Sequence, residues 1–380
     1  MVATAASLGC ILYADADAQI VVSANDAKVQ LVDGVNTPVP TAPPDTVTII
    51  NLRSGSPRVI VELPVPNSIV GPPQNVAITP DESLALVASS TRLDPADGTK
   101  TVPDDKLTVI DLGASPPAVL ATLRAGNGAS GVSINRAGTL ALVANRFDGT
   151  VSVFTIAGKT VSAAGKVVVG TPESLLSGVV FTRDGKTALV TRNNDSLISV
   201  LTIDGTRVEN AKRDFAANLK PYGIDVTPAG DAAIVASIGV GATGGADTLS
   251  VIDLTASPPR SVNHVAVGPV AEGLSISPDG RYVAVTVMNG SNVARTSPFF
   301  NDYGWLRIYS LNKSALALVA QTQIGHWCQG VAWSADNRTV LAQCAVEREI
   351  RTFGFDGRRL AAGPSIKVGG GPSGIRTAQR

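Results

Sequence analysis

The stretch that decides the fold runs from Gly273 to Val287 and reads GLSISPDGRYVAVTV. Apolar residues alternate with small polar ones on both sides of a central Pro-Asp-Gly, and β-branched residues are frequent. A period of two is typical of β-strands, and Pro-Asp-Gly favours a tight turn because glycine accepts a positive φ. The stretch therefore predicts a β-hairpin whose first strand begins at a glycine.

The same pattern recurs along the chain. Related hairpins begin near Asn75, Gly131, Gly178, Gly223 and Gly330, and a shorter copy begins at Gly374. A further strand follows each complete hairpin. Units of roughly 45 residues with four short strands indicate a β-propeller, in which each blade buries its faces against its neighbours. We therefore predict an all-β fold, a single seven-bladed β-propeller over residues 19–380.

The two ends of the chain complement each other. The N-terminal part contributes strands near 20–23 and 46–52 but lacks the strand that begins at a glycine. The C-terminal part supplies only that strand, at Pro372–Arg376. We expect this last strand to complete the first blade, because closing the ring removes two open sheet edges.

Composition excludes several classes of function. The 380 residues contain 31 Lys+Arg and 31 Asp+Glu, a formal net charge of zero, which argues against a nucleic-acid partner. No uncharged apolar run reaches the roughly 18 residues that a membrane span needs. Two histidines and three cysteines are too few for a metal protein rich in these ligands.

The first residues are typical of an export signal. Residues 2–14 are uncharged and small or apolar, and Ala14–Gln19 offers two small-x-small cleavage sites. We predict that residues 1–18 are a truncated signal segment and that the protein is periplasmic or secreted. No Lys or Arg precedes Lys28, so an ordinary ordered N-terminal segment is the alternative.

The cysteines fit the same interpretation. Cys10 would leave with the signal segment. Cys328 and Cys344 lie at equal distances from Asp336, the middle of a hairpin, so they should face each other on neighbouring strands. We predict a disulfide between them in an oxidising compartment. The alternative is a redox-active or metal-binding thiol pair.

The repeat resembles a known family, the bacterial exported YVTN-repeat (lactonase-like) seven-bladed propellers. The resemblance spans residues 20–380 and is carried by Asn75–Ala88, Ala141–Asn145 with Thr150–Val153, and Pro278–Val285. It implies the propeller fold. Because members include lactonases, an electron-transfer dehydrogenase subunit and proteins of other roles, the resemblance specifies the fold and not the activity.

A propeller places the residues before each innermost strand around the mouth of its central channel. Those positions hold Gln74, Ser130, Ser177, Tyr222, Glu272, Gln329 and Ser373. Long loops at 89–106, 238–247 and 288–304 fall on the same rim, and long loops on one face of a rigid scaffold often carry function. We predict a ligand-binding set of Gln74, Tyr222, Glu272, Asn292, His326, Trp327 and Gln329.

Two functional hypotheses follow. The first is an exported propeller that binds a small molecule or a protein partner at the channel rim, since no nucleophile elbow, phosphate loop or Cys-x-x-Cys occurs. The second is a lactonase-like hydrolase or isomerase with Glu272 and His326 as catalytic residues. A divalent cation held near Glu272, Asn75 and Asn194 belongs to this second hypothesis, and no other cofactor is expected. The scarcity of facing titratable groups favours binding.

Overall fold

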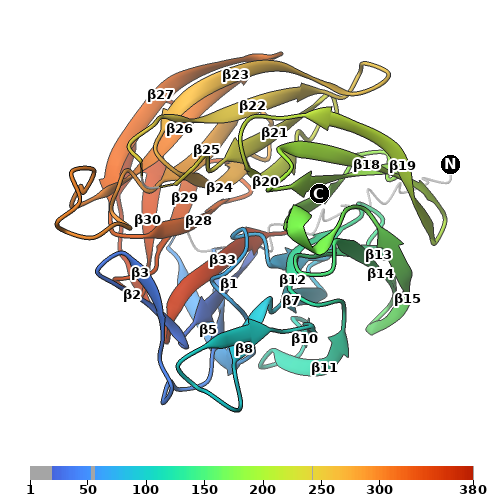
Figure 1. Cartoon of the computed structure of the whole chain (residues 1–380), viewed down its shortest axis with the longest axis horizontal. Coiled ribbons are helices and arrows are strands. Elements are labelled where there is room, and N and C mark those ends of the chain that lie inside the picture. The colour runs from blue at the N-terminus through green and yellow to red at the C-terminus, as the bar shows by residue number, and fades with distance from the viewer. Residues whose placement is uncertain (1–18, 53–55, 242, 380) are drawn as a thin grey trace, which may run out of the picture.

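Seven antiparallel sheets stand around a central axis and form a closed ring (Figure 1). The computed structural model describes residues 19–379 apart from 53–55 and 242. Within these residues one short 3₁₀ helix, Pro172–Ser174, accompanies the strands. The all-β, seven-bladed fold predicted from the repeats is confirmed. The predicted signal segment, with Cys10, lies outside the described residues.

Each blade has four strand positions, ordered from the innermost strand outwards. Blade 1 holds β33 (Gly371–Thr377), β1 (Ile20–Asp26), β4 (Thr46–Asn51) and β5 (Arg58–Pro64); blade 2 holds β6 (Val76–Ile78), β7 (Leu84–Ala88), β10 (Lys106–Asp111) and β11 (Ala118–Arg124); blade 3 holds β12 (Ala129–Ile134), β13 (Leu140–Asn145), β14 (Thr150–Ala157) and β15 (Thr160–Val168). Blade 4 holds β16 (Leu176–Phe181), β17 (Thr187–Arg192), β18 (Leu197–Asp204) and β19 (Arg207–Ala216); blade 5 holds β20 (Pro221–Val226), β21 (Ala232–Ser237), β22 (Asp247–Asp253) and β23 (Arg260–Gly268). Blade 6 holds β24 (Ala271–Ile276), β25 (Tyr282–Val287), β26 (Gly304–Asn312) and β27 (Ala315–Ile324); blade 7 holds β28 (Cys328–Trp333), β29 (Thr339–Cys344), β30 (Glu349–Phe355) and an outer edge split into β31 (Leu360–Ala362) and β32 (Ile366–Lys367).

The ring closes between the two ends of the chain, as the sequence predicts. Strand β33 pairs antiparallel with β1, with Val21 opposite Thr377 and Ser23 opposite Ile375. Figure 1 shows the red β33 beside the blue β1. Blade 1 therefore takes its innermost strand from the C-terminal end and the other three from the N-terminal end.

The recurring glycines permit the close approach of neighbouring innermost strands. A Cβ on Gly131 would meet the backbone oxygen of Ser177 at 2.5 Å, and one on Gly273 would collide with the backbone oxygen of Gln329. Any side chain at these positions would push the blades apart, so the narrow channel depends on glycine. Apolar side chains fill the spaces between successive blades, such as Leu86 of blade 2 against Phe154 of blade 3.

Two small hairpins extend the rim on which innermost strands begin. Strands β8 (Thr91–Leu93) and β9 (Thr101–Pro103) form a hairpin inside the predicted 89–106 loop. Strands β2 (Val29–Val32) and β3 (Val35–Pro38) form a second one that the repeat pattern does not predict. No helix in the described part of the chain is long and apolar enough to cross a membrane.

Candidate functional site

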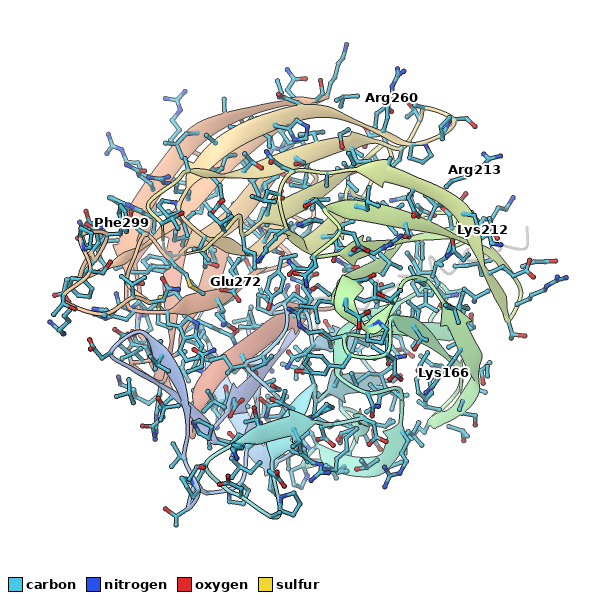
Figure 2. The ribbon with its side chains drawn as sticks, in the orientation of Figure 1. Lys166, Lys212, Arg213, Arg260, Glu272 and Phe299 are labelled. Atoms are coloured by element: carbon cyan, nitrogen blue, oxygen red, sulfur yellow. A yellow bond between two sulfur atoms is a disulfide. The ribbon has the colours of Figure 1, made fainter. Side chains whose placement is uncertain are left out.

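The insertions on this rim contact one another. The backbone N–H of Arg295 donates to Asp33 Oδ1 at 3.1 Å, so the 288–304 loop is tied to the β2–β3 hairpin. The Phe299 ring of the same loop lies against Gly244 of the 238–247 loop, where a Cβ would meet the ring at 2.5 Å. These three segments, 29–38, 238–247 and 288–304, together form the insertion rim. Figure 2 labels Phe299 at its outer side.

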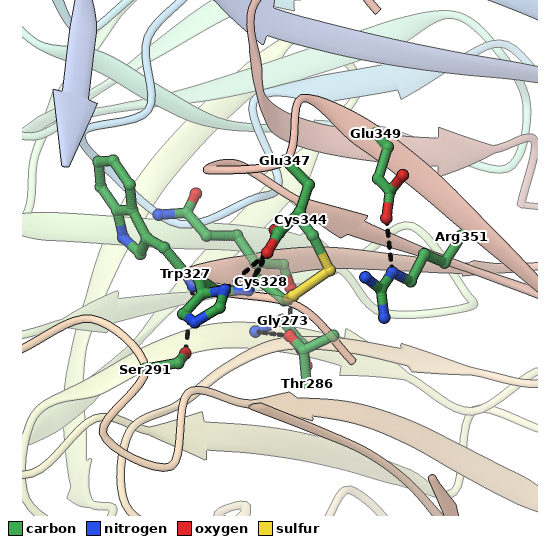
Figure 3. Close-up of a disulfide and its surroundings, with 11 residues drawn as sticks. Gly273, Thr286, Ser291, Trp327, Cys328, Cys344, Glu347, Glu349 and Arg351 are labelled. Carbon is green, nitrogen blue, oxygen red and sulfur yellow. Dashed lines mark hydrogen bonds and ion pairs between the residues drawn. A yellow bond between two sulfur atoms is a disulfide. The ribbon is translucent and has the colours of Figure 1, made fainter. Parts of the chain in front are cut away.

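A buried apolar cluster joins parts of the insertion rim to the segments that link blades. It joins Val29, Ile69, Val270, Met288, Trp327 and Ala345, which come from blades 1, 6 and 7 and from the segments that link blades. Trp327 is only 5% exposed, and its backbone N–H donates to Ser291 Oγ at 3.1 Å (Figure 3). The structure thus places Trp327, one of the predicted ligand-binding residues, inside a buried apolar cluster.

Gln74 bridges the channel from blade 2 to blade 5. Its Nε2 donates to the backbone oxygen of Ile224 at 2.7 Å, and the Ile224 N–H donates to Gln74 Oε1 at 3.0 Å. The side chain is 3% exposed. Both polar atoms of this predicted ligand residue are therefore bonded to the backbone of the opposite wall.

Glu272 and Tyr222 lie together on the channel wall near Arg146. The Arg146 guanidinium stands 5.6 Å from the centre of the Tyr222 ring and donates to Ser177 Oγ at 2.5 Å. Burial raises the pKa of Glu272 to about 8, and the positive charge of Arg146 opposes this rise. Burial also raises the pKa of Tyr222. Figure 2 labels Glu272 near the centre of the ring. With a pKa of about 8, the Glu272 carboxyl is protonated at neutral pH.

His326 lies apart from this group and is held by two carboxylates. Its Nδ1 is 2.7 Å from Glu347 Oε1, and its Nε2 is 2.9 Å from Asp302 Oδ1. Burial alone would lower the pKa of His326, but the hydrogen bonds to Glu347 and Asp302 raise it overall. Because both ring nitrogens are engaged by carboxylates, neither is free to take a proton from a substrate, so His326 is poorly placed as a general base.

The two remaining predicted residues offer acceptors. Gln329 Oε1 and Asn292 Oδ1 are buried and have no hydrogen-bond partner among the described residues. Buried polar atoms in this state are uncommon and costly, so each has capacity for a donor from a bound molecule or water. Of the residues predicted for the site, Tyr222 and Glu272 lie together near Arg146, and His326 lies at a different point of the rim, between Glu347 and Asp302.

The predicted disulfide is present. Cys328 and Cys344 are directly opposite in the pairing of β28 with β29, and a disulfide joins them (Figure 3). Together with Glu347 they form the one group of three metal-type ligand atoms within 4.8 Å among the described residues. Because both sulfurs are bonded to each other, they cannot serve as thiolate ligands.

The three residues suggested for a divalent cation have separate surroundings. Asn75 Nδ2 donates to the backbone oxygen of Ser68 at 3.2 Å, beside the channel. Asn194 Nδ2 donates to the backbone oxygen of Glu173 at 2.9 Å, in an exposed turn. Glu272 instead lies on the channel wall near Arg146. The three side chains thus have different neighbours in the structure.

The opposite end of the channel holds a cavity of about 180 Å³ that the sequence does not predict. Its lining includes Arg376 of β33 and the ends of five other innermost strands. The sequence holds one signal for this cavity, because Arg376 is a charged residue on a strand whose alternate residues face the channel. Without the ring geometry, however, nothing in the sequence connects Arg376 to the hairpins that complete the cavity.

No protein-family model matches the sequence, and no curated protein matches it either. Solved structures match over nearly its full length. A protein from Bacteroides fragilis NCTC 9343 proposed to be a 6-phosphogluconolactonase has a TM-score of 0.71 at 14% identity, covering 95% of this chain and 98% of that one. The periplasmic gluconolactonase of Pseudomonas aeruginosa has a TM-score of 0.69 at 16% identity, covering 95% and 99%. A functionally unknown protein from Desulfotomaculum acetoxidans DSM 771 has a TM-score of 0.70 at 13% identity, covering 95% and 99%. At such identities the likeness shows the fold alone, which is that of a seven-bladed propeller shared with proteins named as lactonases.

Proposed function

We propose that the protein is a binding propeller whose insertion rim contacts a protein partner. The observation that carries this proposal is a set of exposed apolar side chains on all three insertions. Val32 is 53% exposed, Val35 63%, Val240 62% and Phe299 44%. Apolar side chains gathered on one rim, beside the charges of Arg295 and Asp302, are typical of a protein interaction surface.

A protein partner fits this rim better than a small molecule does. Trp327 is buried in an apolar cluster, and both amide atoms of Gln74 are bonded to Ile224, so neither side chain is free to hold a ligand. The exposed apolar groups are spread over three insertions, whereas small-molecule sites are concave and bury most of the ligand. A protein is thus the preferred occupant of the rim, and a small molecule is the other possible result of the test.

The proposal is tested by site-specific photocrosslinking in the host cell. A photoreactive phenylalanine analogue is placed at Val35, Val240 or Phe299, and at Leu120 as a control. Leu120 is 44% exposed, like Phe299, but lies on the outer strand β11. We expect the same protein to be crosslinked from the rim positions and not from Leu120. The purified partner should then bind wild-type protein and lose affinity at least tenfold for Phe299→Ser. Rim positions that crosslink no more than Leu120 would refute the proposal.

Hydrolysis of a lactone is the second candidate, favoured by one observation. A buried carboxyl with a pKa of about 8 stands beside Tyr222 and Arg146, and acid–base catalysis uses groups that titrate near neutral pH. In this candidate Glu272 acts as the proton donor or acceptor, and the carboxylate-bound His326 has a positioning role for the 288–304 loop. The solved neighbours named as lactonases make gluconolactones the substrates to assay.

A direct assay separates the two candidates. If wild-type protein hydrolyses a gluconolactone and Glu272→Gln removes at least 99% of the rate, the hydrolase is established. Glu209→Gln, at an exposed carboxylate on β19, is the matched control and should retain full activity. A wild-type rate equal to the buffer rate, with and without added divalent cations, would remove this candidate.

We also infer that the protein is exported to the periplasm or the medium. The disulfide supports this, because such bonds persist in oxidising compartments. N-terminal sequencing of the protein recovered from the host tests the inference. A mature chain that begins at Gln19 is expected, and a cytoplasmic protein that retains residues 1–18 would contradict it.

A further inference from the structure

The cavity at the far end of the channel is independent of the insertion rim. It opens on the side of the Pro-Asp-Gly hairpins, where the innermost strands end, and it encloses about 180 Å³. A narrower space continues from it along the channel as far as Gln74, with Asp225 and Arg376 lining both. The Gln74 bridge therefore separates this cavity from the mouth near Glu272.

The cavity contains a buried positive charge with few partners. Arg376 projects from β33 and makes one hydrogen bond among the described residues, from its Nη1 to the backbone oxygen of Leu274 at 3.2 Å. A guanidinium has five N–H donors, so most of its donor capacity faces the cavity. Burial lowers the pKa of Arg376, which means that the surroundings penalise its charge, and the nearby Asp225 offsets only part of this.

The carboxylate nearest to Arg376 is already engaged with other donors. Asp225 Oδ2 accepts the Ile276 N–H at 3.1 Å, and Asp225 Oδ1 accepts the Val226 N–H at 3.0 Å and Gln379 Nε2 at 2.6 Å. No direct hydrogen bond joins Asp225 to Arg376 in the described chain. A buried guanidinium that its own protein leaves unpaired is costly, and an anion in the cavity would compensate it.

Two further arginines stand at the entrance. Arg136 follows β12 and Arg183 follows β16, both are exposed, and both line the cavity. Neither has an ion pair with any described residue. The stem of Arg183 packs over Gly230, where a Cβ would meet the Arg183 Cβ at 2.7 Å. The second lining carboxylate, Glu82, accepts the Ile20 N–H at 3.3 Å.

Apolar side chains form another part of the wall, beside polar residues such as Gln19, Thr227 and Gln379. The buried rings of Phe181 and Trp333 line the cavity together with Ile134 and Ile276. The Trp333 Nε1 donates to the backbone oxygen of Ser275 at 3.1 Å, so the indole is fixed. Cavities of about 150 Å³ accept a benzene molecule, so this volume suits a ring-sized body with one attached acidic group.

We propose that this cavity is a binding site for a small organic anion. Its carboxylate or phosphate group pairs with Arg376 inside and with Arg136 and Arg183 at the entrance, and its ring-sized apolar body lies against Phe181 and Trp333. Arginine suits this role because its planar fork binds either acidic group through two parallel hydrogen bonds. The site lies outside the proposed insertion-rim interface and does not depend on it.

The test is calorimetric titration of the full chain with four probes at low ionic strength. Benzoate and phenyl phosphate carry the ring and the charge, benzamide carries the ring alone, and inorganic phosphate carries the charge alone. We expect at least one of the two aromatic anions to bind at least tenfold more tightly than both benzamide and inorganic phosphate. Whichever aromatic anion binds more tightly identifies the acidic group. Affinity should fall when salt is added, because the contact is ionic.

Variants locate the binding. Arg376→Gln should weaken the aromatic anion at least tenfold, and the double variant Arg136→Gln/Arg183→Gln at least fivefold. Because both entrance arginines are exposed, the double variant decides the matter even if Arg376→Gln fails to fold. Arg213→Gln, at an exposed arginine on β19, is the control that should leave the affinity unchanged. The proposal is wrong if the aromatic anions bind no better than benzamide, or no better than inorganic phosphate. It is also wrong if the double variant binds like wild type.

Discussion

Replacing Glu272 by glutamine should change how the stability of the protein depends on pH. Glutamine has nearly the same shape but never carries the negative charge that burial disfavours. Burial raises the pKa of Glu272 from an ordinary 4.5 to about 8, against the opposing charge of Arg146. The folded protein therefore binds this proton more tightly than the unfolded chain does.

The sign and size of the effect follow by linkage. Below pH 4.5 the carboxyl is protonated in both the folded and the unfolded state, so its ionisation does not affect the free energy of unfolding. Between pH 4.5 and 8 the unfolded chain releases the proton while the folded protein keeps it, so wild-type stability falls as the pH rises. Each pKa unit corresponds to about 1.36 kcal/mol, so the loss reaches on the order of 5 kcal/mol above pH 8. Glu272→Gln does not suffer this loss, and its advantage over wild type should grow across the same interval.

The assay is urea unfolding of both proteins at several values between pH 4 and pH 9, followed by circular dichroism. The informative quantity is the change with pH in the difference between the two free energies of unfolding, since a constant offset reflects the hydrogen bonds of the amide. Glu209→Gln, at an exposed position, controls for the loss of one charge. With Arg146→Met in both proteins, the difference should begin to rise at the same pH but continue to rise to higher pH, because the charge that opposes the raised pKa of Glu272 is gone. A difference between Glu272→Gln and wild type that stays level from pH 4 to pH 9 would refute a buried, proton-retaining carboxyl.

Three further predictions concern the scaffold. Gln74→Met leaves the N–H and the carbonyl of Ile224 buried without partners, which should cost about 2–4 kcal/mol and speed the hydrogen exchange of the Ile224 amide; an exchange rate equal to wild type would count against the bridge. The variant Cys328→Ala/Cys344→Ala removes a disulfide that closes a loop with a sequence separation of 16. Its free energy of unfolding in urea should be about 3 kcal/mol lower than that of oxidised wild type and should equal that of reduced wild type. Deletion of residues 370–380 should abolish the cooperative thermal transition, and a truncated protein that melts like wild type would disprove closure by β33.

The hairpin repeat was predictable because its determinants are local. The alternation in Gly273–Val287 specifies two strands, and Pro-Asp-Gly specifies the turn between them. The facing cysteines were predictable for the same reason, since positions equidistant from the turn of a regular hairpin must pair. The β2–β3 hairpin also has a local signal, because Asp33-Gly34 stands between Val32 and Val35.

The candidate site was less accessible to sequence reasoning, because it depends on contacts across the ring. That Tyr222 and Glu272 line one channel follows from the repeat. That Gln74 engages both its amide atoms with Ile224 does not, because the contact depends on the width of the channel. The surroundings of His326 and Arg376 likewise come from segments distant in the sequence, namely Asp302 for the first and Leu274 for the second.

The pairing of β33 with β1 also sets the order in which the molecule can be completed. Strand β1 is synthesised early and its inner partner β33 late. Blade 1 can therefore be completed only after the six other blades have been synthesised. Contacts between such distant segments slow folding, because the chain must close a very long loop before the contact is gained. Until then β1 presents an unpaired edge that strands of other molecules can occupy. During synthesis, the inner edge of β1 is therefore protected only after the seven residues of β33 have been made.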